Sequence, residues 1–62
     1  MPLFLVHMFE GRSAEQKRAF VEAITKTTCE TLKCSPEAVD IIIHDVRRED
    51  WATAGVPWAD KK

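Results

Sequence analysis

The sequence has little of what usually stabilises a very short chain. Its 62 residues form one expected domain, residues 1–62, and a single core of that size contributes roughly 3–5 kcal/mol at most. Two cysteines, Cys29 and Cys34, have no apolar signal segment before them, which disfavours a secreted disulfide-rich domain. With two separated histidines, His7 and His44, they give no ligand set typical of zinc. We therefore expect a reduced, cytoplasmic protein without a metal, which gains its missing buried surface by oligomerisation.

Long apolar runs and an excess of one charge are also missing. Nine basic and ten acidic residues give a net charge of −1, so no domain-wide positive potential exists to hold nucleic acid or an anionic membrane. No apolar run approaches the roughly 20 residues of a membrane helix. The composition is otherwise that of a folded domain, with 45% hydrophobic residues. We expect neither nucleic acid nor a membrane as a partner.

Two strongly apolar segments stand out along the chain. Residues 3–9 read LFLVHMF and residues 39–46 read VDIIIHDV. Both are too continuously apolar for strands with one face in water, so each is predicted to be a strand that is covered on both faces.

The segment between these strands has the pattern of an amphipathic helix. Ser13 precedes Gln16 by three residues, as in a capping box, which predicts a helix that begins near Ala14 and ends near Leu32. One apolar face recurs every four residues, at Phe20, Ile24, Thr28 and Leu32.

This order of elements predicts an α/β fold. A strand, a helix of about twenty residues and a second strand form one β-α-β unit with parallel strands. One helix covers only one face of the strand pair, so the other face and the edges require further copies of the chain. The tail, residues 47–62, contains two tryptophans, Gly55 and Pro57, and predicts a turn or short C-terminal hairpin that reaches onto a neighbour. The sequence therefore predicts a single β-α-β unit with a short hairpin, assembled as a homo-oligomer.

Pro2 is the first candidate for chemistry. Removal of Met1 would leave a free secondary amine, and apolar surroundings or nearby cations would lower the pKa of an α-amino group from its usual 7.7–8.0 or so. A neutral amine near pH 7 could accept a proton from carbon, or add to a carbonyl to form an iminium. The plain alternative is a proline that only begins an edge strand.

The residues after Pro2 favour the chemical role. Residues 10–17 read EGRSAEQK, and seven residues separate Pro2 from this motif. This pattern resembles the 4-oxalocrotonate tautomerase family, whose small members share P-x7-E-G-R-[ST]-x-E-Q-K. The resemblance continues through the helix, the isoleucine-rich strand and residues 46–55, so it covers nearly the whole chain.

This resemblance implies an isomerase that needs no cofactor. It implies a hexamer built from dimers, in which Pro2 is the general base that tautomerises small enolised 2-keto acids such as 2-hydroxymuconate-like dienols. Arg12 matches the arginine that binds a substrate carboxylate from a neighbouring subunit, a task that suits a guanidinium. Trp51 matches an aromatic position that walls the pocket. Their plain alternatives are a solvated turn residue and an interface anchor.

One position departs from the family pattern. Asp40 stands where better-known members carry a second arginine; an acid there would repel a dicarboxylate and favour a charged amine. Arg47 or Arg48 could supply the missing cation, or could simply be solvated. Asp40 also leaves open a family variant that hydrates, dehalogenates or decarboxylates a small unsaturated acid. A non-catalytic oligomeric module anchored by Trp51 and Trp58 is a further alternative. The histidines and cysteines receive no chemical role.

Overall fold

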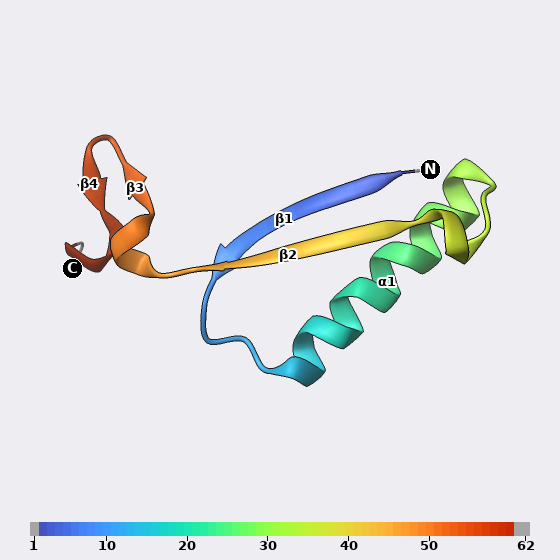
Figure 1. Ribbon diagram of the computed structural model, residues 1–62, viewed down its shortest axis with the longest axis horizontal. Helices are drawn as coiled ribbons and strands as arrows, with labels where there is room; N and C mark the ends of the chain where they lie inside the picture. Colours follow the sequence, from blue (N-terminus) through green and yellow to red (C-terminus); the bar gives the residue numbers. More distant parts are fainter. Residues whose placement is uncertain (1, 61–62) are drawn as a thin grey trace.

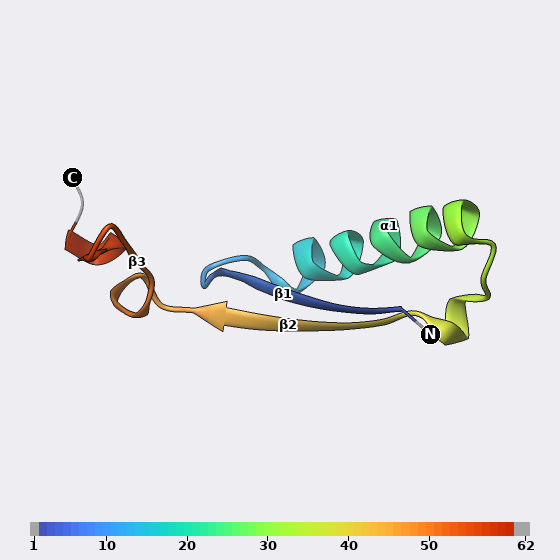
Figure 2. The ribbon, with the colours of Figure 1, turned by 90° about the horizontal axis from the view of Figure 1, so that it is seen from above.

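A computed structural model of the chain describes residues 2–60 and shows two layers, a strand pair and one helix (Figure 1). The strands are β1 (Leu3–Phe9) and β2 (Asp40–Val46), and the helix is α1 (Ala14–Leu32). Figure 2 shows α1 along one face of the strand pair and nothing on the opposite face. The predicted β-α-β unit is confirmed. No helix of the described part of the chain is long and apolar enough to cross a membrane.

The two strands pair in parallel, as predicted. Their register runs without a break from Leu3 beside Asp40 to Phe9 beside Val46. The ladder extends one step before β1, because the Asp40 N–H donates to the Pro2 carbonyl oxygen over 3.0 Å. The first residue of β2 is therefore held against the residue that precedes β1.

Both ends of α1 follow the sequence closely. The Ser13 hydroxyl accepts from the Gln16 N–H over 3.1 Å, and the Ser13 N–H donates to the Gln16 side-chain oxygen over 3.0 Å, so the predicted capping box is confirmed. At the other end Lys33 takes a left-handed conformation with φ of 57°, which turns the chain out of the helix. A short 3-10 helix, η1 (Pro36–Ala38), leads into β2.

The layer between helix and strands is thin. The strand side chains that face α1 are half-buried: Phe4, Val6, Met8, Ile41 and Ile43. Thr28 of α1, 8% exposed, is the one buried residue in the described part of the chain, and no hydrophobic side chain there is buried. A single chain therefore has no closed core, as its length predicts.

The predicted apolar stripe of α1 is only partly covered. Ile24 is half-buried and Thr28 is buried, whereas Phe20 is 41% exposed and Leu32 60% exposed in the single chain. Two strands about 5 Å apart make a surface narrower than a helix with its side chains, which is about 10 Å across. The margins of the stripe consequently stay open.

The opposite side of the strand pair is uncovered. We call it the open face; its members are Leu3, Leu5, His7, Asp40, Ile42 and His44. Leu3, Leu5 and Ile42 are 55%, 59% and 47% exposed. This is the face that the sequence predicts other copies must cover.

The tail forms four short elements: η2 (Arg48–Asp50), β3 (Ala52–Thr53), β4 (Val56–Pro57) and η3 (Trp58–Asp60). β3 and β4 pair antiparallel, so the predicted hairpin is confirmed. Its two-residue turn has positive φ at both positions, 55° at Ala54 and 79° at Gly55, as primed turns require.

Aromatic rings attach this hairpin to the end of β1. The Phe9 ring lies 4.7 Å from Trp51 and 5.5 Å from Trp58, measured between centroids. The Trp58 N–H donates to the Trp51 carbonyl over 2.8 Å, and the Trp58 indole N–H donates to the Thr53 hydroxyl over 3.0 Å. The hairpin thus packs on its own chain, and its reach onto a neighbouring copy stays a prediction.

Candidate active site

Pro2 lies at the edge where β1 begins and β2 begins. Its residue is half-buried, and its carbonyl oxygen is held by the Asp40 N–H. The beginning of β1 also lies beside η1 at the end of α1 (Figures 1 and 2). The structure therefore fixes the candidate base at one end of the strand pair, next to an acidic residue.

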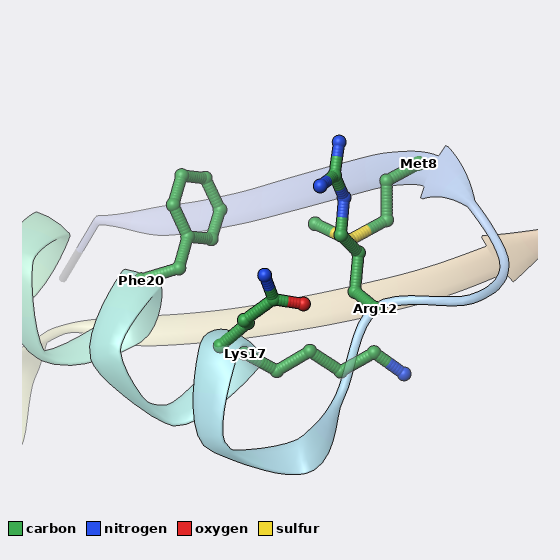
Figure 3. Close-up of a pocket in the computed structure, with 5 residues that line it drawn as sticks. Met8, Arg12, Lys17 and Phe20 are labelled. Atoms are coloured by element: carbon green, nitrogen blue, oxygen red, sulfur yellow. The ribbon is translucent and has the colours of Figure 1, made fainter.

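Arg12 lies at the other end, on the side of the helix. It lines a pocket of about 360 Å³ together with Met8, Gln16, Lys17 and Phe20. Figure 3 shows Arg12 beside Met8, with Phe20 farther along α1 on the same pocket. The pocket thus combines apolar walls with cationic and amide groups, a lining suited to a small carboxylate with an apolar portion.

The two cations of this pocket differ in their partners. The Lys17 ammonium forms an ion pair with the Asp45 carboxylate of β2. Within residues 2–60, Arg12 has no ion pair, and its residue is exposed. Arg12 is therefore the cation of this pocket that has no ion-pair partner in the described part of the chain, and its role in carboxylate binding stays a prediction. Gln16 and Lys17 were not predicted as pocket residues, although they belong to the same sequence motif.

Trp51 is half-buried at the same end of the strand pair as Arg12 but in another pocket. That second pocket, about 490 Å³, is lined by His7, Val46, Asp50, Trp51 and Ala52. His7 belongs to the open face, whereas the pocket of Arg12 is on the helix side. Trp51 thus lines a pocket that contains neither Pro2 nor Arg12, and its predicted place in the wall of the active site stays a prediction.

The three predicted site residues do not meet in one chain. Pro2 is six residues along an extended strand from Met8, which lines the pocket of Arg12, and a strand rises about 3.3 Å per residue. The amine end and the arginine end are therefore about 20 Å apart. Any site that uses both Pro2 and Arg12 requires at least two copies of the chain.

Both arginines after β2 already contact other side chains of the same chain. Arg47 pairs with Glu49 over 3.3 Å and with Asp50 over 3.1 Å, and the hydrogen bond to Asp50 raises the pKa of the Arg47 guanidinium above its ordinary value. The Arg48 guanidinium carbon lies 4.5 Å from the centre of the Phe9 ring, in a cation–π contact. Neither arginine lies at the Pro2 end, so within one chain neither replaces the arginine missing at Asp40.

The remaining candidates of the sequence receive no part in this site. Cys29 and Cys34 are half-buried free thiols, and desolvation, with a smaller effect of Cys34, raises the pKa of the Cys29 thiol, which keeps it protonated and weakly nucleophilic. Among the described residues, no three metal-ligating side chains gather together. His7 and His44 stack on each other, a contact that no sequence pattern predicted because it depends on strand register.

Comparison with known proteins gives a consistent set of relatives. A family profile described as tautomerase enzyme matches residues 2–61. A 2-hydroxymuconate tautomerase of Bacillus subtilis is 40% identical over 97% of each chain, and one of Comamonas testosteroni is 43% identical over 90% of this chain and 89% of its own.

Solved structures similar to this chain belong to the same kind of protein. YwhB, described as a homologue of 4-oxalocrotonate tautomerase, superposes with a TM-score of 0.92 at 38% identity and covers 98% of this chain and 100% of its own. A chain of a heterohexameric 4-oxalocrotonate tautomerase from Chloroflexus aurantiacus gives a TM-score of 0.91 at 29% identity, with all of both chains covered. The fold of those proteins is the tautomerase fold.

Proposed function

The chain belongs to the tautomerase family, and we propose that it tautomerises small enolised 2-keto acids with Pro2 as the general base. As a tautomerase it is an isomerase. Two relatives are named 2-hydroxymuconate tautomerase. A substrate of that class fits a pocket in which an arginine lies beside apolar walls.

The proposed base is the amine that Pro2 carries once Met1 is removed. A neutral secondary amine takes the proton of the substrate enol hydroxyl and returns it to a carbon of the conjugated chain, so that the dienol becomes the unsaturated ketone with no atom gained or lost. Half-burial of Pro2 beside the apolar strands disfavours its charged form. The exchange needs no cofactor.

The observation that carries the proposal is the separation of Pro2 from Arg12 along β1. A second copy running in the opposite direction brings its Pro2 to the arginine end of the first. Arg12 of one copy then binds the substrate carboxylate while Pro2 of the other moves the proton. The exposed apolar open face supports the same arrangement, because copies that meet there gain the core that one chain lacks.

The proposed assembly is a homo-oligomer, a hexamer built from dimers. A relative matched over the whole chain, the 4-oxalocrotonate tautomerase of Chloroflexus aurantiacus, is a heterohexamer. Trp51 would then wall the site of a neighbouring copy with its ring and exclude water from the amine.

Intact mass and one substitution test the base. We expect the natively produced protein to lack Met1, and Pro2→Ala to lower kcat on a 2-hydroxymuconate-type dienol by about 10²–10⁴-fold, the usual contribution of a general base. A Pro2→Ala protein that is as active as the parent, or an active protein that retains Met1, would refute the role of Pro2.

A second reaction of the same amine is favoured by one contact. The Asp40 N–H bonds to the Pro2 carbonyl, so an acidic residue adjoins the amine-bearing residue. A carboxylate near the amine can activate water for hydration, dehalogenation or decarboxylation of a small unsaturated acid. A substrate panel tests this alternative: release of halide or hydrated product faster than tautomerisation, lost in Asp40→Asn, would support it.

A further inference from the structure

His7 and His44 form a stacked pair on the open face. They are register partners of β1 and β2, their ring centroids are 4.9 Å apart, and their planes differ by 13°. Both residues are exposed in the single chain. Their proximity is therefore fixed by strand pairing, while their contact with water depends on what covers the face.

The surroundings of the pair are apolar and weakly charged. Leu5 and Ile42, which are themselves register partners, precede the two histidines on the same face. Two carboxylates lie toward the pair: Asp40, four residues before His44 on β2, and Asp50 of η2, which lines a pocket with His7.

Neither carboxylate compensates a charge on the rings. The Asp50 carboxylate is already bound by Arg47, and within residues 2–60 neither imidazole forms an ion pair. The Lys17–Asp45 pair lies on the opposite face, toward the helix. Protonated rings on the open face would therefore depend on water for their stabilisation.

Copies of this chain are the occupants that fit the open face. Its leucines and isoleucine are about half exposed, and no hydrophobic side chain of the described residues is buried, so the chain lacks a core until that face is covered. A relative matched over all of both chains belongs to a heterohexamer.

We propose that the stacked His7–His44 pair makes this assembly acid-sensitive, holding copies together when both rings are neutral and separating them when the rings are protonated. The inference rests on the oligomeric arrangement of the proposed function. Covering the face removes water from the rings, and two positive rings stacked in an apolar contact repel each other with little screening.

The sign of the effect follows from proton linkage. The separated chain, with both rings in water, binds protons more readily than the assembled chain. Assembly is thus favoured while both rings are neutral, and it is lost as falling pH protonates them. Each proton taken up per chain on dissociation changes the apparent dissociation constant per chain about tenfold per pH unit.

The ring geometry argues against a preformed metal site at the pair. An imidazole nitrogen donates its lone pair in the plane of its own ring. The two stacked planes are nearly parallel, so they share no nearby point at which one ion could bind both rings. Acid sensitivity therefore explains the pair better than metal binding does.

Light scattering after size-exclusion chromatography, from about pH 8.5 to about pH 4 at fixed protein and salt concentration, tests the proposal on the full chain. We expect the parent to dissociate with a midpoint between about pH 5 and 6.5, and the double variant His7→Gln/His44→Gln to remain assembled at least about one pH unit lower. Asp45→Asn, which removes a titrating carboxylate from the opposite face, is the matched control and should keep the parent's midpoint.

The outcomes separate this inference from the proposed function. A parent protein that is monomeric at pH 8.5 refutes the oligomeric site itself. A parent that is assembled at pH 8.5 and stays so to pH 5, or a double variant that dissociates together with the parent, overturns the inference alone. If the double variant does not fold, NMR titration of the parent's imidazole protons decides: two rings that protonate near pH 6.5 within an intact oligomer would equally overturn it.

Discussion

Two inactive variants should regain activity when they assemble together. Pro2→Ala replaces the proposed secondary-amine base by the primary amine of alanine, and Arg12→Ala removes the proposed carboxylate-binding group, so in each variant alone one half of every site is impaired. In one chain these groups are about 20 Å apart, because six residues of extended strand separate Pro2 from the pocket of Arg12. Under the proposed function, a site that uses both groups must therefore take them from different copies.

The magnitude follows from random mixing. The two variants are unfolded together in equal amounts and refolded. A site is complete if its amine comes from an Arg12→Ala chain and its arginine from a Pro2→Ala chain. Each condition is met in half of the sites, so about one site in four is complete at a reciprocal interface. We expect about a quarter of the parent's turnover of a dienol substrate, measured against each variant refolded alone.

A matched mixture distinguishes the alternative geometry. Parent protein refolded with an equal amount of the double variant Pro2→Ala/Arg12→Ala gives about a quarter of the sites intact if each site uses two copies, and about half if each site lies within one chain. A mixture of the single variants no more active than the mean of its components, together with half activity in the second mixture, would refute a site shared between copies.

Three further substitutions probe the site and the helix. Arg12→Lys keeps the charge but loses the two-pronged hydrogen bond, so KM should rise about tenfold while kcat changes little; an unchanged KM would contradict carboxylate binding there. Asp40→Asn removes a negative charge next to Pro2, and this removal should lower the pKa of the Pro2 amine. The acid limb of the pH profile of kcat/KM should therefore move to lower pH. An acid limb that does not move would show that the carboxylate does not influence the amine. Ser13→Ala removes the cap of α1 and should lower the free energy of unfolding by about 1 kcal/mol, measured by urea titration at one protein concentration. Ser13→Thr can still cap the helix, so this control should keep most of the parent's free energy of unfolding.

The local features of the fold were predictable from sequence. Continuous apolar runs defined both strands, and the Ser13–Gln16 spacing defined where α1 begins, because each depends on neighbours in the chain. The coverage of α1 was less predictable. Whether Phe20 or Leu32 is buried depends on how many strands lie under the helix, and a single chain supplies only two.

Pro2, Arg12 and Trp51 were singled out from the sequence, and their roles stay predictions. Gln16, Lys17 and most contacts of the candidate site were not predicted. The motif identified Arg12, but its pocket with Phe20 forms only when the helix lies against β1. The contact of Asp40 with Pro2 and the stacking of the histidines both depend on the register of two strands that are distant in sequence. The hydrophobic pattern of a strand selects which face is covered, but the pattern of one strand alone does not identify its register partners in another.

Under the proposed arrangement, β1 couples assembly to catalysis. Its side chains alternate, so one set faces α1 while Leu3, Leu5 and His7 require another copy to cover them. Pro2 precedes the beginning of β1, and the chain reaches Arg12 just after its end. When a second copy runs in the opposite direction along this strand, Pro2 of each copy lies beside Arg12 of the other. A two-fold contact is reciprocal, so each such pairing completes two sites at once. A chain too short to have its own core would then have an active site only in the state that also gives it a core.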